Sequence, residues 1–313
     1  MKKLLLILLV VLALFTVSLY LFIPGKITID SSVVVKTTDV GTERFVIDDT
    51  KWPLWWNYGT AGDHQRGPVF THNGYSFQPT GKFYKSIDIA IGKEKQRLHS
   101  KLLIIAMAVD STSLQWKTEL TPGSNPVARI TAYLEAKRIK ENMTEILGNL
   151  QDFLSKTANI YGIHIERNRL RDTLYVSSKQ LLPKNPTVKD IYQLIDKIKI
   201  YIQQNGTEPS GSPIYNTTRM DEGRYQLMVA IPVNKQLKET NEFSMKYMVK
   251  GSFMITEVAG GDSTINKAAK NMQQYFQDYR KTSMAMNFTM LVTDRILQPD
   301  SSKWVTKLCM PVY

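Results

Sequence analysis

The sequence predicts an α+β protein in which an apolar N-terminal helix precedes two domains that each combine strands with helices. Three observations predict this class. A long uncharged run follows two lysines, a series of strand-like segments leads into a long amphipathic helix, and the pattern strand, helix, hairpin then occurs twice. A chain of 313 residues is long enough for two cores. The predicted divisions are 1–25, 26–162 and 163–313.

The first division is predicted to be a transmembrane signal anchor. The run from Leu4 to Ile23 holds no charge and, at about 1.5 Å per helical residue, spans a hydrocarbon layer of roughly 30 Å. A cleaved signal peptide would have a shorter apolar region that ends in small residues, which this segment lacks. Lys2 and Lys3 favour the cytoplasmic side, so we expect a single-pass protein that contacts membrane lipid through this helix, with periplasmic domains.

The second division begins with a β-branched strand and a short helix, which breaks near Pro53. After a Gly- and Pro-rich region, four strands are predicted as an antiparallel meander, at 82–91, 96–109, 113–120 and 128–135. A long amphipathic helix follows over 135–162, because its apolar residues recur at spacings of three and four.

In the third division the pattern restarts and then repeats. The first cycle is a strand at 171–182, a helix at 186–206 and a hairpin of 212–220 with 225–233. The second is a single strand at 244–260, a helix at 263–282 and a hairpin of 286–295 with 301–312. Two successive β-α-β-β units predict a pseudo-twofold domain with a groove between its halves.

Composition and motifs restrict the possible functions. The formal charge is +12, but the 40 basic residues are scattered among 28 acidic ones, so no nucleic-acid partner is expected. The single cysteine, Cys309, excludes an intramolecular disulfide and a multi-cysteine metal site, and only four histidines are available as other soft metal ligands. No metal site or cofactor is predicted. Nucleophile elbow, phosphate-loop and zinc-protease motifs are absent from the sequence, so no catalytic residue is assigned.

The first domain carries the segment "KWPLWW" with Trp52, Trp55 and Trp56, placed after a strand and before the meander and long helix. This layout resembles the START/polyketide-cyclase superfamily, SRPBCC. The resemblance implies a helix-grip fold, in which a curved sheet wraps around the long helix and leaves an apolar cavity. The three tryptophans are the candidate ligand-binding residues of this domain, and packing in the core is the alternative. We expect at least one in the core and one at the cavity mouth.

The third division carries a set of motifs in order along the chain: "YIQQNGTEPSGSPIY", "YQLMVAIPV", "MVKGSFMITEVAGG", "LVTDR" and "PDSSKWVTKLCMPV". Together they resemble the gyrase-inhibitory-protein-like (GyrI-like) small-molecule-binding domain, which is also the effector-binding part of bacterial transcription activators. The resemblance implies a ligand groove and a sensor module. No helix-turn-helix segment precedes residue 163, so the DNA-binding half of such regulators is not expected.

One departure from that family bears on the ligand. Relatives usually carry a groove glutamate in the strand before "TD", where a carboxylate pairs with a lipophilic cation. In this chain the position falls at Thr289 or Met290. The resemblance therefore implies neither cation recognition nor the glutamate-dependent hydrolase activity of some relatives. Glu257 is the one candidate that could supply a carboxylate from another strand, and a surface position is the alternative.

The predicted function is a membrane-anchored protein that binds a small apolar or amphiphilic ligand. The candidate ligand-binding residues of the second domain are largely aromatic side chains on predicted strands, since rings give large contact areas. They are Tyr215, Tyr225, Phe253, Glu257, Phe288, Thr289, Met290 and Trp304. The first alternative is a hydrolase of small reactive compounds, which would require a buried acid near Tyr225 or Trp304. The second is a structural or interaction protein without a ligand.

Overall fold

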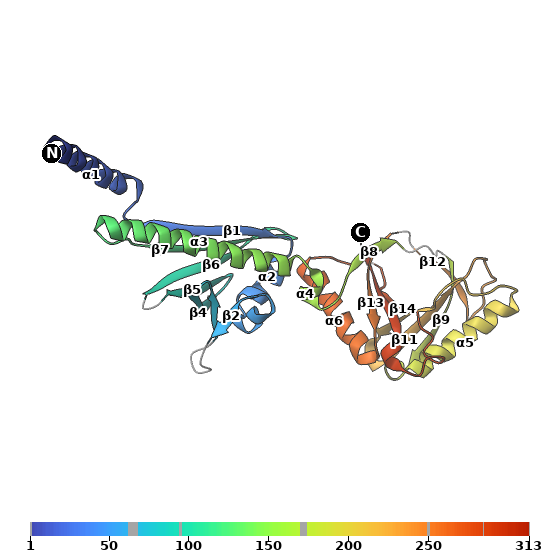
Figure 1. The fold of residues 1–313 in the computed structure, drawn as a ribbon. Helices are drawn as coiled ribbons and strands as arrows, with labels where there is room; N and C mark the ends of the chain where they lie inside the picture. The colour runs from blue at the N-terminus through green and yellow to red at the C-terminus, as the bar shows by residue number, and fades with distance from the viewer. Residues whose placement is uncertain are drawn as a thin grey trace. The chain divides into compact units, whose positions relative to one another are not determined.

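The computed structural model describes residues 2–61, 68–93, 96–169, 174–248, 251–283 and 285–312. The chain divides into two compact units, Met1–Ile160 and Tyr161–Tyr313, and each contains one antiparallel sheet with helices (Figure 1). The predicted α+β class is confirmed.

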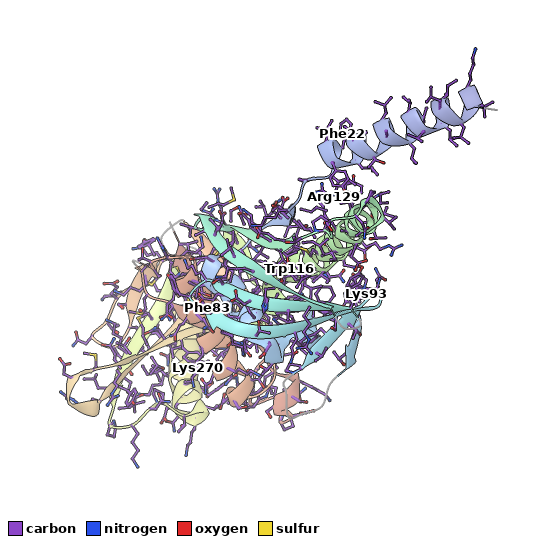
Figure 2. All side chains as sticks on the ribbon, turned by 90° about the vertical axis from the view of Figure 1, so that its left-hand side faces the viewer. Phe22, Phe83, Lys93, Trp116, Arg129 and Lys270 are labelled. Atoms are coloured by element: carbon purple, nitrogen blue, oxygen red, sulfur yellow. The ribbon has the colours of Figure 1, made fainter. Side chains whose placement is uncertain are left out.

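The first helix, α1 (Lys2–Phe22), covers the predicted apolar run. By length and composition it could cross a membrane, with a mean hydropathy of 3.0 over its apolar stretch. Arg129 lies close to its last turn, which ends at Phe22 (Figure 2). The Nη1 atom of Arg129 donates to the carbonyl of Ile23 at 2.6 Å, and the guanidinium lies 4.1 Å from the ring centre of Tyr20.

The sheet of the first unit has seven strands in the order β1-β7-β6-β5-β4-β3-β2. Neighbours pair antiparallel, so strands β2 to β7 form a meander and β1 closes against the last of them. The predicted strands at 96–109 and 113–120 correspond to β6 and β7, whereas the predicted strand at 82–91 spans the turn between β4 and β5. The strands are β1 (Ile27–Val35), β2 (Gly59–Ala61), β3 (Val69–His72), β4 (Tyr75–Phe83), β5 (Ser86–Lys93), β6 (Gln96–Ala108) and β7 (Ser111–Leu120).

The long helix α3 (Pro126–Leu154) packs on this sheet and buries the predicted apolar face, including Ile139, Met143 and Leu150. The predicted strand at 128–135 is wrong, because these residues form the first turns of α3. Asn125 caps the helix, since its side-chain oxygen accepts from the Ala128 amide at 2.6 Å, and a proline follows at the first helical position. The other helices of this unit are α2 (Asp39–Val46), the 3-10 helix η1 (Asp49–Leu54) and α4 (Thr157–Tyr161), whose last residue begins the second unit.

The sheet of the second unit has eight strands in the order β12-β9-β11-β10-β14-β15-β13-β8. The triplets β9-β11-β10 and β14-β15-β13 come from the two repeats, and they join where β10 pairs with β14. The strands are β8 (Glu166–Arg169), β9 (Leu174–Leu182), β10 (Ile214–Arg219), β11 (Tyr225–Pro232), β12 (Ser244–Tyr247), β13 (Ser252–Ala259), β14 (Phe288–Leu291) and β15 (Val305–Val312).

The strands of the second unit differ from the sequence prediction at two places. The single strand at 244–260 is wrong, because β12 and β13 occupy distant positions in the sheet, next to β9 and β15 respectively. The sequence also missed β8, whose four residues are all exposed and therefore carry no apolar pattern.

Helices α5 (Val188–Gln204) and α6 (Asp262–Asp278) follow the first strand of each repeat. Alternate strand residues such as Leu227, Val229 and Ile231 form one core with α5. The residues between them point to the opposite face, where Ala230 joins a separate apolar cluster with Phe253 and Phe288. The sheet therefore has a helix-covered face and an opposite face, each with its own buried side chains.

Candidate functional site

A groove of about 710 Å³ lies on the helix-covered face of the second sheet. The N-terminal part of α5 and the inner side of α6 form its walls, and β10, β14 and β15 form its floor. Apolar side chains such as Ile191, Ile265 and Leu308 line it together with many polar ones. The polar side chains are Asn185, Thr187, Tyr215, Asn216, Thr217, Asp262, Asn266, Gln273, Asn287, Thr289 and Arg295. A molecule bound there would meet both apolar contact area and hydrogen-bonding groups.

Arg295 is the charged side chain of the groove that is most deeply buried, with 2% of its side chain exposed. Its guanidinium contacts Asp262 at 3.1 Å and the hydroxyl of Thr306 at 3.2 Å, and it lies 4.6 Å from the ring centre of Trp304. Its Nε atom is buried and makes no hydrogen bond within the described residues. A buried donor without an acceptor costs stability, so an acceptor atom of a ligand could satisfy it.

Tyr215 and Thr289 lie opposite each other where the two repeats join, since their Cα atoms pair across β10 and β14. Both side chains are half-buried and line the groove. Burial raises the pKa of the Tyr215 hydroxyl, and the nearby Arg295 opposes part of that shift. At neutral pH the phenol is therefore protonated and can donate a hydrogen bond.

The entrance beside α5 is fixed by a capping box. The Thr187 hydroxyl accepts from the Asp190 amide at 3.3 Å, and the Asp190 carboxylate accepts from the Thr187 amide at 2.8 Å. The hydrogen bond from the Thr187 hydroxyl is the main reason that the pKa of Asp190 is below its usual value. This reciprocal bonding holds the first turn of α5 in place at the groove wall.

A second, smaller cavity of about 210 Å³ lies on the opposite face of the same sheet. Its lining is mainly apolar and includes Tyr175, Ile214, Ala230 and Phe253. Tyr215, Asn216 and Phe288 border both cavities, because β10 and β14 belong to the wall between them.

The predicted site residues of the second domain fall into three groups. Tyr215, Phe288 and Thr289 line the groove, and Phe253 lies in the cavity of the opposite face. Met290 is half-buried and packs beside that same cluster. Tyr225 and Trp304 are half-buried but are not among the residues that line either cavity, and the indole of Trp304 donates to the Gln298 carbonyl at 2.7 Å.

Glu257 lies outside the groove. Its Cα atom pairs with that of Lys307 on β15, its side chain is 59% exposed, and its carboxylate contacts the Lys307 ammonium at 3.3 Å. The acid that does line the groove is Asp262, which is 62% exposed and paired with Arg295. The buried acid that the hydrolase alternative requires is therefore not found near Tyr225 or Trp304 in the described residues.

The three tryptophans of the first unit all lie in its core, with 1%, 3% and 4% exposure for Trp52, Trp55 and Trp56. Their indole N–H groups donate to backbone carbonyls, those of Val46, Phe45 and Thr71 respectively. The rings of Trp52 and Trp56 stack with centres 5.7 Å apart. The tryptophan segment thus fills space between η1 and the sheet.

Sequence reasoning missed the residues that give the groove its polarity, namely Arg295, Asp262 and Asn266. The sequence did contain a signal for Arg295, which directly follows the apolar strand of "LVTDR". An arginine that is buried beside such a strand needs a partner for its charge. Asp262 and Asn266 lie one helical turn apart on α6, which places them on one face.

No protein-family model matches the chain, and no curated protein matches it either. Similar solved structures do exist. EcmrR in its DNA complex has 14% identity and a TM-score of 0.44, with 60% of this chain and 72% of that chain covered. The EcmrR C-terminal domain has 12% identity and a TM-score of 0.40, with 48% of this chain and 98% of that chain covered. SAV2435 bound to tetraphenylphosphonium has 15% identity and a TM-score of 0.34, with 48% of this chain and 94% of that chain covered.

These structural neighbours are GyrI-like effector-binding domains, the kind that the motifs of the third division predicted. They assign neither a ligand nor a reaction to this chain. The resemblance of the first unit to the SRPBCC superfamily stays a prediction.

Proposed function

We propose that the second unit binds a small, partly apolar molecule reversibly in the groove between α5 and α6. The observation that carries this proposal is the groove of about 710 Å³, in which the two repeats bring a buried arginine and a protonated tyrosine together with apolar side chains. Pockets for small molecules typically combine apolar contact area with a few placed polar groups. The protein would then act as a sensor module.

The charges of the groove define the class of ligand. The position at which relatives of this kind carry a carboxylate falls at Thr289 or Met290, neither of which is an acid, and Asp262 is paired with Arg295. The free Nε donor of Arg295 and the phenol of Tyr215 both favour an acceptor atom on the ligand. A neutral or anionic ring compound with a carbonyl or carboxylate oxygen therefore fits better than a lipophilic cation.

The proposal extends to location and to the first unit. The length and composition of α1 support a single membrane anchor. Fractionation of cells that express the full chain tests this, because an anchored protein stays with the membranes after an alkaline carbonate wash, and recovery in the soluble fraction contradicts it. A long helix on a curved antiparallel sheet supports a START-like first unit, whose described interior is filled by tryptophan.

The ligand class can be tested by titrating the full chain, kept in an amphipathic polymer, with three probes of similar size. We expect 2-naphthoate and 2-naphthamide to bind more tightly than tetraphenylphosphonium in isothermal titration calorimetry. Tyr215→Phe removes one hydroxyl and should weaken binding of the first two by about two- to tenfold, which is the usual effect of one hydrogen bond.

Tyr225→Phe provides the matched control. It makes the same chemical change at a half-buried tyrosine of the same unit that does not line the groove. Equal loss in both variants, or a preference for tetraphenylphosphonium, contradicts the proposal.

A further inference from the structure

The cavity on the opposite face of the second sheet has a lining that differs from that of the groove except along their dividing wall. Its volume is about 210 Å³, and its floor is built from side chains that alternate with those facing the helices. The end of the edge strand β12, at residues 246–247, and residues 248 and 285–286 also contribute to its lining. Apolar cavities of about 150 Å³ can hold a benzene ring, so this cavity has room for an aromatic ring or a short hydrocarbon chain.

The lining of this cavity is mainly apolar, and the one charged side chain among its described residues is basic. Tyr175, Ala230, Phe253 and Phe288 are each buried to 8% exposure or less. No acid occurs among the described residues that line the cavity, and Lys246 is the single charged one.

Lys246 stands at the exposed edge of this cavity. Its Cα atom pairs with that of Tyr175, so the two side chains lie on the same face of the sheet. The side chain is exposed, and no acid within the described part of the chain forms an ion pair with it. Met286 also lines the cavity and is 47% exposed. Methionine side chains adapt readily to flexible apolar partners.

We propose that this cavity binds a single-chain amphiphile whose hydrocarbon chain enters between Tyr175 and Phe253 and whose carboxylate pairs with Lys246. Removing the chain from water supplies the affinity, and the ammonium of Lys246 selects an anionic head group over a cationic one. The site lies on the other face of the sheet from the groove and shares with it the dividing residues Tyr215, Asn216 and Phe288.

The test is photo-crosslinking of the full chain, held in an amphipathic polymer, with a decanoate that carries a diazirine near the end of its chain. Peptide mapping by mass spectrometry should place the main adducts on residues that line the cavity, with Met286 among them. Unlabelled decanoate should compete at lower concentrations than decanol and at much lower concentrations than decyltrimethylammonium.

Two exposed lysines of the second unit give the matched variants. Lys246→Gln should raise the decanoate concentration for half-competition by about three- to fivefold, as expected for an exposed ion pair. Lys270→Gln, on α6 (Figure 2), should leave it unchanged. Adducts spread over the chain without enrichment at the cavity, equal effects of the two variants, or equal competition by the three amphiphiles would each overturn the proposal.

Discussion

The two units use aromatic side chains differently, although both pack them between a sheet and helices. In the first unit Trp52, Trp55 and Trp56 are fully enclosed, and backbone carbonyls accept from all three indoles. In the second unit Tyr215 is half-buried at the edge of a groove and lies near Arg295, whose Nε donor has no acceptor in the described residues.

This difference teaches that aromatic density alone does not distinguish a binding site from a core. A ring whose polar atom is bonded within the fold, with packed atoms on every side, is part of the core. A ring that lines a cavity together with polar groups whose hydrogen-bonding capacity is not used within the fold is a candidate for ligand contact.

The largest expected effect concerns Cys309, which lies in the sheet between the two cavities. Burial raises the pKa of its thiol to about 12. At pH 8 the folded protein should therefore react with iodoacetamide about a thousandfold more slowly than a free thiol with a pKa near 8.5. Mass spectrometry of the alkylated protein measures this, with the urea-unfolded chain as the control. Rapid alkylation of the folded chain would show that this wall opens and that the two cavities are not separate.

The second prediction compares deletion of one ring in each unit. Trp52→Ala should lower the free energy of unfolding of the first unit by about 3–5 kcal/mol, because the ring is enclosed on all sides. Phe288→Ala should lower the free energy of unfolding of the second unit by about 2 kcal/mol. The loss is smaller because cavities border this ring, which therefore contacts fewer packed atoms. Urea denaturation followed by circular dichroism gives both values. A larger loss for Phe288→Ala would reverse the contrast.

The smallest expected effect concerns a charged pair at the edge of the first core. The Lys85 ammonium donates a hydrogen bond to the Asp39 carboxylate and thereby holds the pKa of Asp39 below its usual value. A lowered pKa in the folded state stabilises the fold above the unfolded pKa of about 3.9, and this stabilisation is lost as the pH falls through the folded pKa. Asp39→Asn should therefore lower the free energy of unfolding by about 1 kcal/mol at pH 7. Below the folded pKa of Asp39 the substitution should have almost no effect.

Urea denaturation of the unaltered chain and of Asp39→Asn, at pH values from 7 down to below the folded pKa of Asp39, measures this change in the free energy of unfolding. Glu119→Gln, which breaks the exposed pair of Glu119 with Lys26, is the control and should have a smaller effect at pH 7. A cost for Asp39→Asn that does not change with pH would contradict the assigned cause.

Much of the fold could be predicted from periodicity. The long helix and the two β-α-β-β repeats have regular apolar spacing, and all three exist. Local alternation misled the prediction at 128–135, where the Asn-Pro cap signal was the better guide. The split of 244–260 into β12 and β13 could not be predicted from that spacing, because a continuous β pattern does not reveal which neighbour each part pairs with.

The candidate site was less accessible to sequence reasoning. Tyr215 and Thr289 were among the candidates and lie paired across the join of the repeats, whereas Tyr225, chosen for the same reason as Tyr215, lies elsewhere. The polar groups that distinguish the groove come from α6 and from the loop after β14, and their meeting depends on how the second repeat folds back on itself. Sequence spacing carries no record of such a contact.

The most direct test of ligand binding in the groove is native mass spectrometry of the full chain purified from its own host. We expect one small molecule bound in the groove of each chain, distinct in mass from any amphiphile held in the cavity of the opposite face. Thr289→Trp, which places a large ring in the groove, should lose it, whereas Thr218→Trp, the same change at an exposed threonine that does not line the groove, should retain it. Circular dichroism confirms that both variants are folded. Absence of a groove ligand from the unaltered chain, or retention of every bound molecule in folded Thr289→Trp, would contradict ligand binding in the groove.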